Sequence, residues 1–141
     1  MAHLYLSGDD KDIMIGNFIA DSVKGKAYLK YRNGIQHGIL LHRKIDELTD
    51  NHRITKDLSS FFKSHFHRYS GIIIDVVYDH FLSKNWDNYS EISLKSFIKK
   101  SHGILLKSIR VLPPQVQGFL PIMIAKNRLY SYSKIEGLKD A

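Results

Sequence analysis

The residues best suited to chemistry interrupt one apolar stretch, residues 71–86. Asp75, Asp79 and His80 lie within a run of isoleucine, valine, tyrosine and phenylalanine. The apolar side chains predict a buried segment, in which an ionised carboxylate is costly unless it is paired or bound to a metal ion. On a helix, Asp75 and Asp79 would share one face and His80 would approach from its flank. The stretch therefore indicates a metal or catalytic site, with helix-capping or arginine-paired carboxylates as the alternative.

The same stretch could also form a buried strand, because five of its residues are β-branched. Two observations favour a helix. Strict alternation fails, since Asp75 and Asp79 would share a strand face with Ile73 and Val77. The stretch also runs for about sixteen residues without a turn signal, which is long for a strand.

Two further predicted helices each bring ligand-type residues to a face that we expect to be buried. An acidic start and a closing glycine predict a helix over residues 9–24, with Asp21 at its buried edge. An Asn-Gly turn precedes a second helix over residues 35–48. Its His42 and Asp46 are one turn apart and could grip one ion from two sides. Taken singly, each feature is also typical of ordinary surface charges.

Together these residues form a mixed set of carboxylate and imidazole ligands, with His3 as a further candidate. The chain contains no cysteine, so a metal site must use histidine, acidic or carbonyl ligands, which suit Mg²⁺, Mn²⁺, Fe²⁺ or Zn²⁺. A divalent ion lowers the pKa of a bound water and neutralises a phosphate oxygen, and hydrolysis of a phosphodiester needs both effects. The predicted metal ligands are His3, Asp21, His42, Asp75, Asp79 and His80.

The rest of the chain also predicts helices, which makes this an all-α fold in a single domain over residues 1–141. Pro113 and Pro114 break the chain. No apolar run approaches the roughly 18 residues that cross a membrane, and no secretory leader is evident. The additional helices are expected over residues 57–69, from a cap at 90–93 to about 106, over 116–126, and from 130 onward.

The formal net charge of +7 predicts an acidic partner. The excess of basic residues lies in residues 51–141. We expect no nucleic acid, because the sequence has neither an RNP-type aromatic motif nor a glycine-rich phosphate loop. No membrane association is expected either.

Four segments, in order along the chain, resemble the acyl carrier protein phosphodiesterase family. The resemblance implies a compact helical bundle similar to the HD-type metal-dependent phosphohydrolases, and a requirement for Mn²⁺ or Mg²⁺. It also implies hydrolysis of the phosphodiester between 4′-phosphopantetheine and the serine of holo-acyl carrier protein, giving apo-acyl carrier protein. Because the family continues through further helices, we expect this chain to lack the C-terminal ones. The four segments are AHLYLSG (2–8), GNFIAD (16–21), GILLHRKIDELTDNH (38–52) and DVVYDHFLSKNW (75–86).

The resemblance also assigns residues. Asp21 matches the acid of the family's G-N-x-x-A-D motif and is expected to position or deprotonate the attacking water. His42 and Asp46 match its H-R-x-I-D motif, and Asp79 and His80 match its D-H pair. The predicted catalytic residues are therefore Asp21, His42 and Asp46.

An acidic carrier protein in the cytoplasm would give the basic excess a role in docking. The residues expected to bind the carrier or its phosphate are Lys24, Lys26, Arg43, Lys44 and Arg53. Two alternatives remain open. One is an HD-like hydrolase of nucleotides or of another phosphodiester, and the other is an inactive basic module that only binds the carrier.

Overall fold

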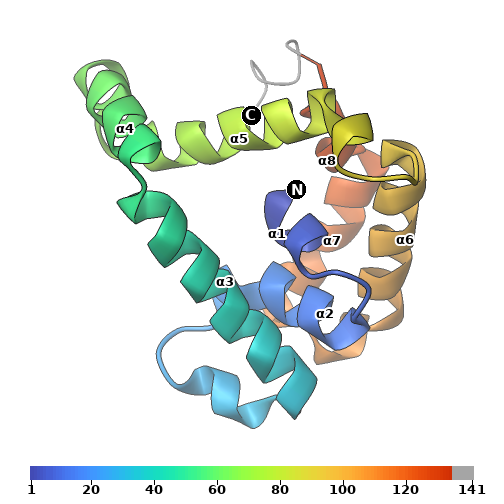
Figure 1. Cartoon of the computed structure of the whole chain (residues 1–141). Coiled ribbons are helices and arrows are strands. Elements are labelled where there is room, and N and C mark those ends of the chain that lie inside the picture. The colour runs from blue at the N-terminus through green and yellow to red at the C-terminus, as the bar shows by residue number, and fades with distance from the viewer. Residues whose placement is uncertain (135–141) are drawn as a thin grey trace.

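A computed structural model describes residues 1–134 of the chain, and every regular element among them is a helix (Figure 1). This confirms the all-α prediction. The single-domain, HD-like and missing-helix expectations stay predictions. The α-helices are α1 (Ala2–Leu6), α2 (Lys11–Ile19), α3 (Asn33–Asn51), α4 (Arg53–Phe66), α5 (Ser70–Lys84), α6 (Leu94–Lys107), α7 (Pro114–Ala125) and α8 (Arg128–Ser131). Short 3₁₀ turns are η1 (Ala20–Ser22), η2 (Ala27–Lys30), η3 (His67–Tyr69), η4 (Trp86–Asn88) and η5 (Ile109–Val111).

The helices predicted within residues 1–126 all occur, with shifted ends. Asp10 caps α2 by accepting hydrogen bonds from the backbone N–H groups of Asp12 and Ile13, but the helix ends at Ile19 and continues as η1. The helix expected over residues 35–48 continues to Asn51, and the break before α4 falls at His52 alone. The segment expected from residue 130 onward mostly lies outside the described residues.

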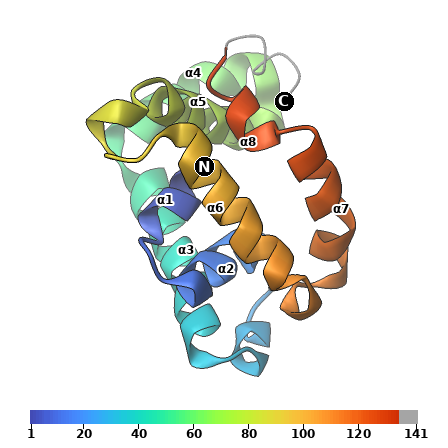
Figure 2. The ribbon, with the colours of Figure 1, turned by 90° about the vertical axis from the view of Figure 1, so that its right-hand side faces the viewer.

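The hydrophobic core is built around α2, not around the 71–86 stretch. Met14, Ile15 and Ile19 of α2 are almost fully buried against Ile35 and Ile39 of α3. The other side of the core comes from the later helices, with α6 crossing in front of the α1–α2 layer and α7 beside it (Figure 2). Burial of these side chains is the main favourable contribution to folding.

The expectation that residues 71–86 are buried on every side is wrong. They form α5, as the helical interpretation predicted, and Ile74 and His80 are buried. However, Ile72 is 60% exposed and Phe81 is 55% exposed. One side of α5 lines a cavity instead of packing against other side chains. Asp75 and Asp79 lie on this side.

Two glycines set the close crossing of α2 and α3. A Cβ atom on Gly16 would lie 2.1 Å from the Ile35 carbonyl oxygen, and one on Gly38 would lie 2.2 Å from the Ile13 carbonyl oxygen. Neither neighbour is a side chain that could rotate away. This backbone contact brings Asn17, the residue after Gly16, within hydrogen-bond distance of His42 on α3.

No helix within residues 1–134 has both the length and the apolar composition that crossing a membrane requires.

Candidate functional site

A cavity of about 810 Å³ opens between α1, α3, α4 and α5, with η1 at one edge. Its walls hold residues from distant parts of the chain, including Ala2 and His3 at the start and Asp75 and Asp79 on α5. Figure 1 shows why, since α3, α4 and α5 follow one another around the amino-terminal residues. Most of the side chains with predicted chemistry therefore share one space.

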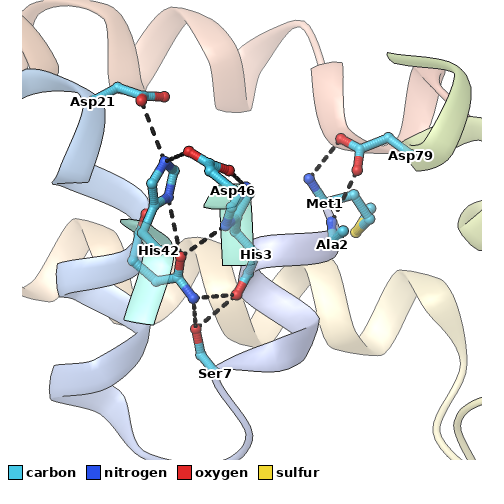
Figure 3. A network of polar contacts seen from close by, with 9 residues as sticks. Met1, Ala2, His3, Ser7, Asp21, His42, Asp46 and Asp79 are labelled. Atoms are coloured by element: carbon cyan, nitrogen blue, oxygen red, sulfur yellow. Dashed lines mark hydrogen bonds and ion pairs between the residues drawn. The ribbon is translucent and has the colours of Figure 1, made fainter. Parts of the chain in front are cut away.

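The centre of the site is a carboxylate between two imidazoles (Figure 3). One oxygen of Asp46 lies 3.1 Å from His42 Nε2, and the other lies 3.2 Å from His3 Nε2. Asp21 Oδ1 approaches the same His42 nitrogen at 3.2 Å. The two imidazole rings stack with centroids 3.9 Å apart. Contacts thus connect four of the predicted residues, which come from α1, η1 and α3, with His42 touching each of the other three.

Asn17 determines the tautomer of both imidazoles. Its backbone carbonyl lies 2.9 Å from His42 Nδ1, and a carbonyl oxygen can only accept, so that nitrogen carries a hydrogen. The Asn17 Nδ2 group donates to the His3 carbonyl at 2.8 Å, which fixes the orientation of the amide. Its Oδ1 therefore accepts from His3 Nδ1 at 3.0 Å. When neutral, both rings then present an Nε2 lone pair to the carboxylates.

Lone pairs facing carboxylate oxygens repel unless a proton or a cation lies between them. In the protein without an ion, a proton on His42 meets this need. Burial lowers the pKa of His42, but the hydrogen bond to Asp21 and the charge of Asp46 outweigh it and hold this pKa above its ordinary value. Burial and the nearby His42 charge lower the pKa of His3. The hydrogen bond from His42 lowers the pKa of Asp21, which keeps that carboxylate ionised.

The same geometry suits a metal ion. One ligand atom each from His3, His42 and Asp46 lies within 4.8 Å of the others, which is a separation that one ion can bridge. Two imidazole nitrogens and one carboxylate form a mixed donor set typical of divalent transition metals. The Nδ1–H hydrogen bonds to Asn17 are the outer contacts that orient metal-binding histidines in proteins.

Replacing Asn17 with leucine is expected to release His3 from the Nδ1–H tautomer but to leave His42 in it, because the backbone carbonyl that accepts from His42 Nδ1 remains. Leucine keeps the approximate size of the side chain but removes every side-chain hydrogen bond, so the free energy of unfolding should fall by about 1–3 kcal/mol. Nitrogen NMR of the imidazoles at pH 9 should show Nδ1–H for His3 and His42 in the parent protein and a substantial Nε2–H population for His3 alone in the variant. An unchanged His3 tautomer would contradict the role of the Asn17 side chain.

The three predicted residues of α5 have different surroundings. Asp79 binds the amino-terminal residues, accepting from the Met1 amino group at 2.7 Å and from the Ala2 backbone N–H at 2.9 Å. His80 does not line the cavity, because its buried ring lies with Nδ1 2.8 Å from the Tyr132 carbonyl oxygen. The structure therefore does not bring His80 to the His3–His42–Asp46 group, since its position on α5 turns it toward the carboxyl-terminal helices.

Asp75 lines the cavity from α5 and shares it with other acids. Burial raises the pKa of Asp75 to about 6, and the negative charges of Asp46 and Asp79 act in the same direction. The folded chain therefore holds this proton more tightly than the unfolded chain does. Its contribution to stability is favourable at low pH and is lost as the pH rises from about 4 to about 6.

We expect Asp75→Asn to stabilise the metal-free protein at pH 7.5 and to have little effect at pH 4. The full shift corresponds to about 3 kcal/mol, but solvent screens a partly exposed carboxyl, so about 1 kcal/mol is expected. Urea unfolding at the two pH values, with a chelator present, measures the difference. An equal effect at both pH values would show that the charge of Asp75 is not the cause.

The predicted carrier-binding residues do not line the cavity, and their role in docking stays a prediction. Arg43 braces the loop before η2, because its Nη2 donates to the carbonyls of Val23 and Gly25 at 2.9 Å each. Lys44 pairs with Glu47 at 3.0 Å. The remaining three, Lys24, Lys26 and Arg53, are exposed outside the cavity.

Two groups of residues in the site were not predicted from the sequence. Asn17 is one of them, although a lone amide in an apolar helix is itself a sign of a buried hydrogen-bond network. The basic residues that do line the cavity are Lys56 and Lys63 of α4 and Arg68 of η3. The spacing of Lys56 and Lys63 puts both on one helical face, but nothing in the sequence shows that this face meets α5.

Comparisons with known proteins agree on one family. A family model described as "Acyl carrier protein phosphodiesterase" matches residues 1–141. Curated proteins with this name match at 30% identity in Yersinia enterocolitica and at 32% in Salmonella paratyphi A, each covering 99% of this chain and 73% of the relative. A relative of that name from Enterobacter sp. matches at 31%, over 96% of this chain and 71% of its own length. No solved structure matches the chain significantly.

Proposed function

Because this chain belongs to the acyl carrier protein phosphodiesterase family, we propose that it hydrolyses the phosphodiester joining 4′-phosphopantetheine to a serine of holo-acyl carrier protein. The products are apo-acyl carrier protein and free 4′-phosphopantetheine. The observation that carries this proposal is the family match over all 141 residues. The cavity, with acids and imidazoles gathered at one end, supports it as a site for hydrolysis at a phosphate.

The proposal includes a divalent cation held by His3, His42 and Asp46. The fit of these donors favours Mn²⁺ or Fe²⁺ over Mg²⁺, because imidazole suits the former ions better than the latter. When bound, such an ion activates water and neutralises charge on the phosphate. The expectation of Asp75, Asp79 and His80 as ligands stays a prediction, and so does a cytoplasmic location.

The chain's own residues have distinct parts in the proposed reaction. Asn17 holds His3 and His42 with their Nε2 atoms toward the cavity. The Asp21 side chain is 86% exposed at the same edge and can accept a proton from the attacking water. Asp75 keeps a proton to higher pH than an ordinary aspartate and can deliver it to the departing serine oxygen. The new bond joins the water oxygen to phosphorus, and the bond from phosphorus to the serine oxygen breaks.

The direct test is to incubate the chain with holo-acyl carrier protein and Mn²⁺ and to follow both products by mass spectrometry. Conversion to the apo form with release of 4′-phosphopantetheine is expected, and a chelator should stop it. A folded, Mn²⁺-loaded chain that leaves the holo-carrier intact would refute the proposed function.

A further inference from the structure

The cavity has a second chemical region at the end formed by α4 and η3. Lys56, Ser59, Ser60 and Lys63 occupy successive positions on one face of α4, and all four line the cavity. Arg68 adds a guanidinium group from η3, where its Nη2 donates to the Tyr69 hydroxyl at 2.9 Å. We call Lys56, Ser59, Ser60, Lys63 and Arg68 the α4 wall.

The two lysines of the α4 wall have no acidic partner among the described residues. Among residues 1–134, no ion pair involves Lys56 or Lys63, whereas Lys44, Lys100 and Arg32 all have acidic partners. Five aspartates line the cavity. Asp21, Asp46 and Asp79 contact the histidines or the Met1 amino group, and neither Asp50 nor Asp75 forms an ion pair with a lysine of the α4 wall. Within residues 1–134, the charges of Lys56 and Lys63 are therefore not neutralised by an ion pair.

The position of the bond to be cleaved requires the carrier protein to lie close to the α4 wall. In the proposed reaction, only the Cβ and Oγ atoms of one serine separate the reacting phosphorus from the backbone of the carrier. A phosphorus atom next to the histidines therefore requires the carrier itself to lie at the rim of the cavity. Its surface must then contact the walls that surround the histidines, and α4 is one of them.

We infer that the α4 wall is the docking surface for an acidic helix of the carrier protein. Lys56 and Lys63 are two helical turns apart, about 10 Å along α4. That row is long for one phosphate group but matches acidic side chains spaced one or two turns apart on a facing helix. The inference deepens the proposed function and rests on it for the identity of the partner.

The test measures binding of apo-acyl carrier protein, which lacks the prosthetic group, to the full chain by calorimetry. The variant is Lys56→Glu with Lys63→Glu, and the matched control is Lys99→Glu with Lys107→Glu on α6. The control makes the same change in net charge at two exposed lysines outside the cavity. We expect the α4 variant to weaken binding at least tenfold at low salt and the control to change it less than threefold. The difference should shrink at 0.5 M NaCl, because salt screens exposed charges.

Three results would overturn the inference. The first is apo-carrier binding that the α4 variant does not weaken, and the second is an equal loss in the α6 control. The third is a loss of inorganic phosphate binding alone, which would make the α4 wall a small-anion site. Should the glutamate variant not fold by thermal melting, Lys56→Gln with Lys63→Gln replaces it, with a loss of at least threefold expected. Because apo-carrier binding needs no turnover, a parent chain that binds the carrier but releases no 4′-phosphopantetheine would refute the proposed function and leave the docking surface standing.

Discussion

Replacing Asp46 with asparagine is expected to slow release of 4′-phosphopantetheine about a thousandfold, which corresponds to roughly 4 kcal/mol of transition-state stabilisation. Asp46 is the only described residue whose carboxylate contacts Nε2 of both His3 and His42. Asparagine keeps the shape but removes the negative charge, and its amide nitrogen cannot bind a cation. Initial rates with holo-carrier and Mn²⁺ measure the effect.

The neighbouring Glu47→Gln variant is the control for this prediction. Glu47 lies on the same helix, but it pairs with Lys44 outside the cavity. Its activity should stay within threefold of the parent protein. An Asp46→Asn protein that keeps more than a tenth of the parent rate would remove this carboxylate from the chemistry.

Replacing Gly38 with alanine is expected to destabilise the fold by about 3 kcal/mol and to lower the melting temperature by roughly 10 °C. The added Cβ would lie 2.2 Å from the Ile13 carbonyl oxygen and 2.9 Å from the Asn17 backbone nitrogen. Both belong to the backbone of α2, so the helices themselves must separate. Since Asn17 bonds His42 across this crossing, the change should also reduce metal binding in the fraction that folds.

Gly103→Ala is the matched control, because a Cβ at that position of α6 would meet nothing within 4 Å. Alanine in an open helical position should stabilise the protein by about 0.5–1 kcal/mol. Differential scanning calorimetry of both variants therefore separates crowding at the α2–α3 crossing from helix propensity. Equal melting temperatures for the two variants would contradict the role given to Gly38.

The sequence predicts the local structure well because helix periodicity and caps depend on near neighbours. The helix expected over residues 35–48 spans Asn33–Asn51, and the one over 71–86 spans Ser70–Lys84. A cap within residues 90–93 is confirmed at Ser93, whose hydroxyl accepts from the Ser96 backbone N–H. These features need no knowledge of which helices pack together.

The site itself depends on contacts that local patterns do not contain. The four-residue spacing of His42 and Asp46 indicates a shared face, and the structure places the two in contact at 3.1 Å. The position of His3 beside them could not be predicted from the sequence, because it depends on how α1 packs against α3 in the folded chain. Apolar residues all round 71–86 indicated burial, yet α5 covers an open cavity, and His80 turns toward Tyr132. The role of Asn17 depends on the packing of α2 against α3. The α4 wall depends on α4 and α5 lining the same cavity.

The most direct test of the account is an anomalous difference map at the manganese edge from crystals of the full chain grown with Mn²⁺. We predict one peak within bonding distance of His3 Nε2, His42 Nε2 and an Asp46 oxygen. A peak elsewhere would contradict the assigned centre. So would the absence of a peak here at a Mn²⁺ concentration that sustains hydrolysis.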